Sequence, residues 1–492
     1  MTFTTAMTKH VPFSSPFLRD AGYINGVWTA GGATKTFDVI NPATGEVLAS
    51  LPDMGAAETT AAIDAAYAAQ AAWAARPAKE RSAILRKWFD LMVANADELG
   101  AILTAEMGKP LPEARGEILY AASYVEWYAE EAKRIYGETI PAPSNDKRML
   151  VIRQPVGVVG TITPWNFPAA MIARKVAPAL AVGCTVVSKP AEQTPLSAIA
   201  LAVLAEQAGI PAGVFNVIVG IDGPAIGQEL CGNAKVRKIS FTGSTEVGRI
   251  LMRQCSDQIK KVSLELGGNA PFIVFDDADV EAAVDGAMIA KMRNGGEACT
   301  AANRFYVHDA VADAFTTAFA ARMARLNLGA GLDEGTDLGP LVNADTRSKV
   351  SELVDQAAAT GSKVLMGGSA PDRPGYFYLP TVLSEVPPDA GILGQEIFGP
   401  VAPMVRFTSE DEVIALANGT EYGLVSYLYS ADLRRSLRVA EALEAGMVGI
   451  NRGIVSDPAA PFGGVKQSGI GREGGHEGLL EFSEIKYIAV DW

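Results

Sequence analysis

One cysteine and one glutamate stand in glycine-rich segments that suit covalent catalysis on a carbonyl. Cys299 ends the segment Gly295-Gly296-Glu297-Ala298-Cys299, and Glu265 opens the turn Glu265-Leu266-Gly267-Gly268. A thiolate is a strong nucleophile near neutral pH, and a carboxylate can deprotonate a thiol or a water. Each segment alone is more often a buried cysteine or a turn at a strand end. Their joint occurrence predicts a nucleophile and a general base.

Composition narrows the class of protein. The 492 residues suggest two to four domains, with 49% hydrophobic and 20% charged residues as in ordinary globular proteins. The formal net charge of −14 argues against nucleic acid or an anionic membrane surface as a partner.

The cysteines and histidines are too scattered to predict a metal site. Cysteines stand at positions 184, 231, 255 and 299, and histidines at 10, 308 and 476. Free thiols favour a reducing compartment, and residues 1–16 lack a secretory signal pattern. The apolar stretch from 177 to 187 is too short to cross a bilayer. We therefore predict a cytoplasmic protein with no metal and no membrane partner.

The hydrophobic pattern changes character along the chain. Residues 57–105 and 111–136 have helical spacing, and 148–154 are extended. Strands alternate with helices from Val156 onward, which predicts a parallel, doubly wound sheet. The predicted strands are 156–162, 185–188, 214–219, 238–241 and 262–266, and the helices between them are 169–182, 196–208, 225–230 and 246–254. A second alternating region runs from 271 to 449, and 487–492 form a last strand.

Two segments of the predicted sheet could bind a nucleotide. Phe241 to Gly248 follows a strand and opens a helix, where amides can bind a phosphate; an ordinary Ser244 N-cap is equally compatible. Gly220 lies in a similar turn. Lys189 and Glu192 follow another strand, and a carboxylate there would accept ribose hydroxyls and repel a 2′-phosphate. This pattern favours NAD as the cofactor, with NADP possible. The alternative is that Lys189 and Glu192 form only a solvated ion pair on a loop.

Six motifs make the chain similar to a known family. From about Tyr23 onward it resembles the aldehyde dehydrogenase superfamily, and within it the succinate-semialdehyde dehydrogenases. The motifs occur in the family's order: Thr163 to Pro168, Phe241 to Gly248, Leu264 to Gly268, Gly296 to Cys299, Gln395 to Pro400 and Pro461 to Gly469.

The resemblance implies roles for the catalytic residues. Cys299 attacks the aldehyde to form a thiohemiacetal, and Glu265 activates the water that hydrolyses the later thioester. The Asn166 side chain and the Cys299 backbone N–H stabilise the oxyanion. Lys175 and Glu473 lie near a proton path to Glu265. The implied cofactor contacts are Thr163, Pro164, Trp165, Lys189, Glu192, Gly220, Gly243, Ser244, Gly248, Leu266, Glu396 and Phe398.

The resemblance also implies an architecture. We expect an α/β fold with a Rossmann-type NAD-binding domain (1–139 and 157–265) and an α/β catalytic domain (266–455). A small bridging β-sheet (140–156 and 473–492) would pair subunits into a homodimer or homotetramer.

Three positions bear on the substrate. Arg174, Arg293 and Ser456 match residues that bind the distal carboxylate in succinate-semialdehyde dehydrogenases, and arginine forks suit a carboxylate. Structural ion pairs are the alternative for each arginine. We expect oxidation of succinate semialdehyde to succinate with NAD(P)+. Many of these enzymes have Gln at the position of Glu297, and the sequence predicts no particular effect of this difference.

Other functions stay open. The substrate could be another small or carboxylated aldehyde, such as glutarate semialdehyde, lactaldehyde or glycolaldehyde, since one methylene discriminates only about 10–200-fold. A CoA-acylating enzyme and a non-catalytic binding protein on the same fold are further alternatives. The joint presence of Cys299, Glu265 and Asn166 favours a hydrolytic enzyme.

Overall fold

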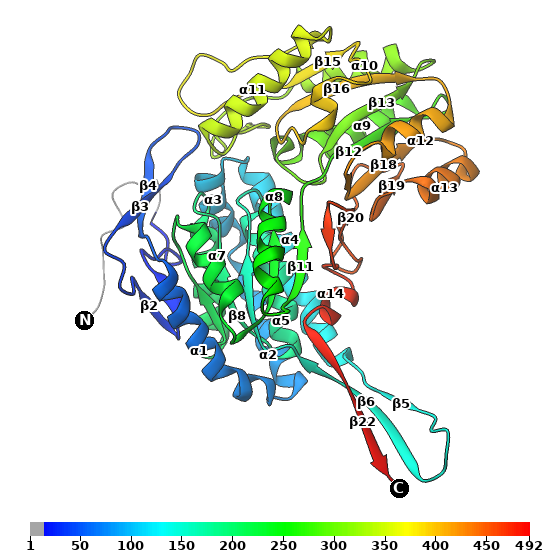
Figure 1. Ribbon diagram of the computed structural model, residues 1–492. Helices are drawn as coiled ribbons and strands as arrows, with labels where there is room; N and C mark the ends of the chain where they lie inside the picture. Colours follow the sequence, from blue (N-terminus) through cyan, green and yellow to red (C-terminus); the bar gives the residue numbers. More distant parts are fainter. Residues whose placement is uncertain (1–13) are drawn as a thin grey trace.

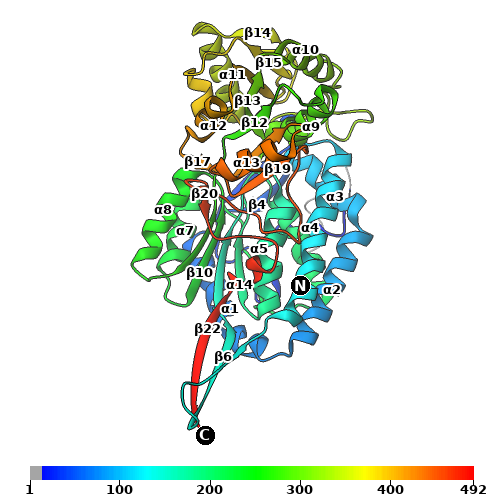
Figure 2. The same cartoon turned by 90° about the vertical axis from the view of Figure 1, so that its right-hand side faces the viewer.

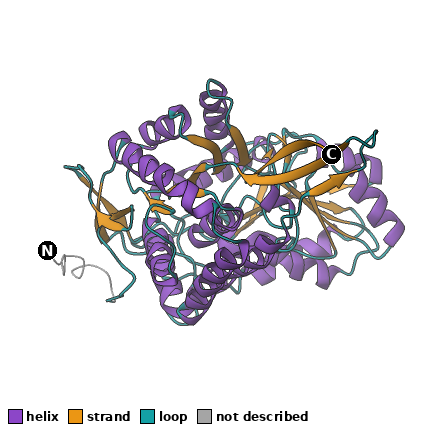
Figure 3. Cartoon of the chain, turned by 90° about the horizontal axis from the view of Figure 1, so that it is seen from below, coloured by secondary structure: helices purple, strands orange, loops and turns teal. Residues whose placement is uncertain are grey.

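The computed structural model describes residues 14–492, and residues 1–13, which hold His10 and the start of the predicted cofactor region, lie outside the described part. Two large β-sheets, each with its own helices, lie one above the other in Figure 1, and a narrow sheet projects from the lower one. Figure 3, from below, shows helices flanking the strands on more than one side. The predicted α/β architecture is confirmed.

The first sheet has the strand order β2-β1-β9-β8-β7-β10-β11-β21. Its five central strands are parallel: β7 (Val158–Ile162), β8 (Thr185–Lys189), β9 (Phe215–Val217), β10 (Val236–Thr242) and β11 (Lys261–Glu265). The order runs outward from β7 to β9 and then returns to place β10 beside β7. Ligands in doubly wound sheets bind at such a reversal, beyond the carboxyl ends of the strands.

The edges of this sheet differ from the purely parallel prediction. A hairpin of β1 (Gly22–Ile24) and β2 (Val27–Thr29) adds to β9 in antiparallel orientation. At the other edge β21 (Gly469–Ile470) pairs antiparallel with β11, placing Gly469 opposite Glu265. Strands of two or three residues are too short to produce an alternating pattern in the sequence. A further hairpin consists of β3 (Thr36–Ile40) and β4 (Val47–Pro52).

Two groups of helices accompany the first sheet. The predicted helices of the sheet are present as α5 (Pro168–Val182), α6 (Pro195–Ala208), α7 (Gly223–Gly232) and α8 (Thr245–Ser256). The Ala-rich segment forms α1 (Ala56–Ala74), α2 (Ala78–Ala94), α3 (Ala96–Met107) and α4 (Leu111–Glu131), followed by the short helix η2 (Ala132–Arg134).

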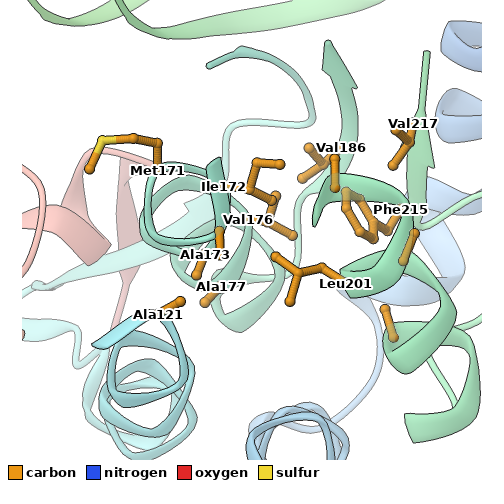
Figure 4. Packing of buried hydrophobic residues seen from close by; sticks show 14 of the residues in the cluster. Ala121, Met171, Ile172, Ala173, Val176, Ala177, Val186, Leu201, Phe215 and Val217 are labelled. Atoms are coloured by element: carbon orange, nitrogen blue, oxygen red, sulfur yellow. The ribbon is translucent and has the colours of Figure 1, made fainter. Parts of the chain in front are cut away.

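Helix α5 is the centre of this core. Every residue of α5 is buried. Figure 4 shows its small side chains Ala173 and Ala177 near Ala121 of α4, while Ile172 and Val176 lie toward β8. Tight packing on both sides fixes the N-terminus of α5, where Asn166 is found.

The second sheet carries the predicted nucleophile. Its order is β14-β15-β16-β13-β12-β18-β19, and all pairs except β14–β15 are parallel. The strands are β12 (Ala270–Val274), β13 (Ala302–His308), β14 (Lys363–Met366), β15 (Thr381–Ser384), β16 (Val401–Phe407), β18 (Val425–Tyr429) and β19 (Met447–Ile450). The helices are α9 (Val280–Met292), α10 (Ala312–Met323), α11 (Ala344–Ala359), α12 (Glu410–Asn418) and α13 (Leu433–Ala442), with short helices η3 (Arg293–Gly296) and η4 (Gly391–Gly394). Cys299 lies between η3 and β13.

The third sheet forms a projecting arm (Figures 1 and 2). It pairs β5 (Glu138–Ile140) with β6 (Lys147–Pro155) and β6 with β22 (Ser483–Asp491), all antiparallel. The extended segments predicted near 148–154 and at the C-terminus are confirmed, and β22 begins earlier than predicted. The remaining elements are β17 (Tyr422–Gly423), β20 (Val465–Lys466) and α14 (Glu477–Leu480).

Candidate active site

A cavity of about 250 Å³ lies where the strand order of the first sheet reverses. Segments from both large sheets line it, so that residues far apart in the sequence meet there. The predicted site residues on its wall are Pro164, Trp165, Asn166, Gly243, Ser244, Leu266, Cys299, Glu396 and Phe398.

The thiol of Cys299 is half-buried, whereas Cys184, Cys231 and Cys255 are fully buried. Burial raises the pKa of Cys299 to about 12; the charges of Glu396 and Glu265 add to this effect, and Arg174 opposes it. A raised pKa favours the thiol form of this sulfur at neutral pH.

Glycines bring the two catalytic turns together. A side chain at Gly268, in the turn after Glu265, would collide with the carbonyl oxygen of Cys299. At Gly296 the backbone has a φ of +80°, and a Cβ would collide with the carbonyl of Gly399. Both positions require glycine, for close approach and for a left-handed conformation.

Two hydrogen-bond donors face the nucleophile. The Nδ2 of Asn166 donates one bond to the carbonyl of Glu297 at 2.9 Å, and its second N–H has no acceptor in the described part of the chain. The backbone N–H of Cys299 also has no acceptor among residues 14–492. These two free N–H groups fit an oxyanion that appears only when the sulfur attacks.

Glu265 is a buried carboxyl group with a free oxygen. It is 3% exposed, and its Oε2 has no hydrogen-bond partner within residues 14–492. Burial raises its pKa well above the usual value, and Glu473 adds to this, against the opposing charges of Arg174 and Lys175. A raised pKa suits a general base that works near neutral pH.

Glu473, one of the two predicted proton-path residues, contacts the other one, Lys175, and also Arg174. Its carboxylate accepts a hydrogen bond from Lys175 and forms an ion pair with Arg174, with 2.7 Å between Nη2 and Oε2. Burial alone would raise the pKa of Glu473, but Lys175 and Arg174 lower it. The Arg174 guanidinium is 2% exposed and lies 4.0 Å from the Phe462 ring centre.

Arg293 and Ser456 line a second cavity of about 280 Å³. Phe167 lies on the walls of both cavities, so the second one adjoins the Cys299 site. The Arg293 guanidinium lies 4.6 Å from the Phe167 ring centre, and no hydrogen bond or ion pair engages it among the described residues. Arg174, the third residue predicted to bind the substrate carboxylate, is not on this wall.

The glycines near α8 are explained by packing around the first cavity. A Cβ at Gly243 would collide with the Phe241 ring, and one at Gly248 with Leu266. Ser244 caps α8 by accepting a hydrogen bond from the Val247 N–H at 3.2 Å. The predicted cap is therefore present, and Ser244 also lines the cavity, so that the N-terminus of α8 lies beside a space suited to an anion.

Glu396 is held from two sides. Its Oε1 accepts from the Gly268 N–H at 2.9 Å, and Lys349 donates to its carbonyl at 2.8 Å. Burial raises the pKa of Glu396 to about 7. Phe398 packs edge-to-face on Trp165 with 5.5 Å between ring centres.

The other predicted cofactor residues lie outside this wall. Lys189 and Glu192 form an ion pair at 2.9 Å, and the Glu192 side chain is 39% exposed. Burial alone would raise the pKa of Glu192, but Lys189 lowers it, so this carboxyl is anionic. Thr163 is buried after β7, and Gly220 packs directly on the backbone of Met54.

The sequence analysis missed the polar side chains that bind the Asn166 carbonyl. Lys109 donates to the Asn166 carbonyl at 2.8 Å, and Asn294 donates to the same oxygen at 3.0 Å. Lys109 stands between Gly108 and Pro110, a context typical of an exposed loop. Only its burial, 3% exposed, distinguishes it.

Residues 14–492 contain neither a candidate metal site nor a candidate membrane-spanning helix. Among residues 14–492, no group of three or more His, Cys, Asp or Glu side chains is arranged to hold a metal ion. No helix in the same range combines the length and apolar character of a membrane span.

Comparison with known proteins gives concordant matches. The sequence model of the aldehyde dehydrogenase family matches residues 28–488. The chain is 58% identical over 472 residues to a glutarate-semialdehyde dehydrogenase of Pseudomonas putida, covering 96% of this chain and 98% of that protein. It is 56% identical over 476 residues to a succinate-semialdehyde dehydrogenase [NADP(+)] of Escherichia coli, covering 97% and 98%. The crystal structure of succinate-semialdehyde dehydrogenase from Burkholderia pseudomallei has a TM-score of 0.96 and 55% identity, covering 98% of this chain and 100% of that one.

Proposed function

The chain belongs to the aldehyde dehydrogenase family, and on this basis we propose that it oxidises succinate semialdehyde to succinate. The observation that carries the substrate assignment is the Arg293 guanidinium. It has no protein partner among residues 14–492, and it lines a cavity that shares Phe167 with the Cys299 cavity. The half-buried guanidinium packs against the Phe167 and Tyr120 rings, and a substrate carboxylate would complete a charge-assisted pair with it.

The first chemical step forms a carbon–sulfur bond. The Cys299 sulfur attacks the aldehyde carbon, and the thiol proton passes to Glu265 or to water. The carbonyl oxygen becomes an oxyanion, which accepts hydrogen bonds from Asn166 Nδ2 and the Cys299 N–H. Both groups have the N–H required.

The cavity fits a nicotinamide dinucleotide. Gly243 and Ser244, at the N-terminus of α8, line it together with Glu396, Phe398 and Cys299, and amides at a helix N-terminus suit a pyrophosphate. A nicotinamide bound there would supply the hydride acceptor for oxidation of the thiohemiacetal carbon, and Cys299 would then carry a thioester. Glu265 then takes a proton from the water that attacks the thioester carbon. Cleavage of the carbon–sulfur bond releases the carboxylate and restores the thiol.

The Arg293 proposal predicts a selective loss. Arg293→Gln should raise KM for succinate semialdehyde by about 10–100-fold, since a hydrogen bond to a charged group contributes about 1.5–3 kcal/mol. The KM for propanal, which has no carboxylate, should change little. Steady-state kinetics on both aldehydes measure the difference, and equal losses would contradict the assignment.

Arg174 is the matched comparison for Arg293. If it binds the substrate carboxylate as the sequence predicts, Arg174→Gln should discriminate between the two aldehydes in the same way. The ion pair between Arg174 and Glu473 supports a different result, in which the variant has a lower kcat for both aldehydes. The two outcomes distinguish a residue that binds the substrate carboxylate from one that positions Glu473.

Glutarate semialdehyde is the second candidate substrate. The 58% identity to a glutarate-semialdehyde dehydrogenase supports it, and an additional methylene changes specificity by only about 10–200-fold. Comparing kcat/KM for the two semialdehydes decides between them.

For the cofactor we propose NAD in preference to NADP. The Glu192 carboxylate, kept anionic beside Lys189, would repel a 2′-phosphate. Glu192→Ser should therefore shift the ratio of kcat/KM for NAD to that for NADP by at least about 10-fold toward NADP, or roughly 1.4 kcal/mol. NADH and NADPH formation by both proteins measures this, and wild-type preference for NADP would refute the proposal.

The arm supports the proposed homodimer or homotetramer. Strand β22 leaves Ile485 and Tyr487 exposed at 63% and 53%, and Trp492, directly after it, is 79% exposed. Exposed apolar side chains of this kind favour pairing with a second copy. We also retain as proposals the division into cofactor, catalytic and bridging domains and, from the four free cysteines, a reducing cytoplasmic compartment.

A further inference from the structure

A buried ion pair lies behind the oxyanion site, at the junction of α3 and α4. Lys109 Nζ and Glu117 Oε2 are 2.6 Å apart, and their side chains are 1% and 2% exposed. Two charges this deeply buried are costly to desolvate, and replacement by apolar side chains is often no less stable. Stability alone therefore does not account for their presence.

Both side chains form hydrogen bonds with the segment that carries Asn166. Lys109 donates a second hydrogen bond to the Asn166 carbonyl at 2.8 Å. Glu117 Oε1 accepts from the N–H groups of Ala169 and Ala170, at 2.9 and 3.2 Å, in the first turn of α5. The ion pair thus holds Asn166 from its carbonyl and from the helix that follows it.

The nucleophile loop joins the same network from the opposite side. Asn294 Nδ2 donates to the carbonyls of Asn166 and Glu297, each at 3.0 Å. The Asn294 N–H donates to Glu113 at 2.8 Å, and Asn294 has a φ of +54°. Because Asn166 Nδ2 also donates to the Glu297 carbonyl, the network sets the Asn166 side chain relative to Cys299.

We propose that Lys109, oriented by Glu117, is a positioning residue that holds the Asn166 amide at the place where the oxyanion forms. Lys109 also lines the Arg293 cavity; its effect is assigned to the hydrogen bond with Asn166, so the effect should be the same for an aldehyde without a carboxylate. The inference rests on the proposed aldehyde chemistry but not on the choice of aldehyde, since every aldehyde develops the same oxyanion. A side-chain donor displaced by even about 1 Å loses much of its effect on the transition state.

The chain offers a matched control in Glu106. This glutamate is also buried, at 1% exposure, and also caps an inner helix, accepting from the N–H groups of Leu196 and Ser197 at the start of α6. It has no hydrogen bond to Lys109 or to the Asn166 segment among the described residues. Glu106→Gln therefore reports what the loss of a buried helix-capping carboxyl group does by itself.

The test is a double-mutant cycle between Lys109 and Asn166, with propanal and succinate semialdehyde as substrates. Lys109→Met should lower kcat for both aldehydes by about 10–100-fold with little change in KM, a part of the 10²–10³-fold that an oxyanion donor contributes. In an Asn166→Ala background the same change should lower kcat by less than about 2-fold, because the donor is already absent. Glu106→Gln should leave kcat within about 2-fold of wild type.

Two results would overturn the proposal. Independent losses in the double variant would mean that Lys109 does not act through Asn166, and an equal loss in Glu106→Gln would assign the effect to destabilisation. If Lys109→Met does not fold, Glu117→Gln takes its place in the cycle with the same expectations. Turnover of propanal but not succinate semialdehyde by the wild type would refute the substrate and leave this test intact.

Discussion

Cys299→Ala is expected to abolish aldehyde oxidation, with kcat falling by roughly 10⁴-fold or more, because no carbon–sulfur bond can form. The variant should still bind NAD and unfold at the wild-type temperature, since the thiol is half-buried and lines a cavity. NADH absorbance under saturating aldehyde measures the loss.

The other cysteines provide the control for this variant. Cys255 is buried, with its sulfur 3.5 Å from that of Cys231 and away from the cavity wall. Cys255→Ala should retain kcat within a few-fold. A Cys299→Ala protein that keeps more than about 1% of wild-type turnover would remove Cys299 from the role of nucleophile.

Glu265→Gln is expected to give one rapid turnover and then stop. The amide cannot take a proton from water, so the thioester should accumulate, and steady-state kcat should fall by about 10²–10⁴-fold. Rapid mixing should therefore show a burst of NADH equal to the concentration of active sites. Added hydroxylamine, which attacks a thioester without a general base, should restore turnover.

The pH dependence supplies a second measurement. Burial and the neighbouring Glu473 raise the pKa of Glu265 well above its usual value, so wild-type thioester hydrolysis should increase with pH as this carboxyl loses its proton. The Glu265→Gln protein should lack that increase. A variant that forms no burst would instead assign Glu265 to deprotonation of Cys299, whose thiol has a pKa near 12.

Local sequence was sufficient to predict residues that meet at one cavity and most of the elements around it. Cys299 and Glu265 lie in short glycine-rich motifs whose chemistry is carried by adjacent residues, and both line or adjoin the predicted site. The parallel strands were predictable because their apolar runs alternate regularly with helices. The antiparallel strand β21 was not, since two residues contain no pattern.

The side-chain pairs that control charge were decided by the tertiary structure. Whether Arg174 faces the substrate or Glu473 depends on a contact between residues 299 positions apart, in which sequence spacing has no influence. Lys109 likewise becomes a buried partner of Asn166, 57 residues away, only when α4 packs on α5. The sequence by itself determined which chemical groups this protein has and the elements that carry them. Packing decided which charges have ion-pair partners and which, like Arg293, have none among residues 14–492, because burial and pairing are properties of the folded chain.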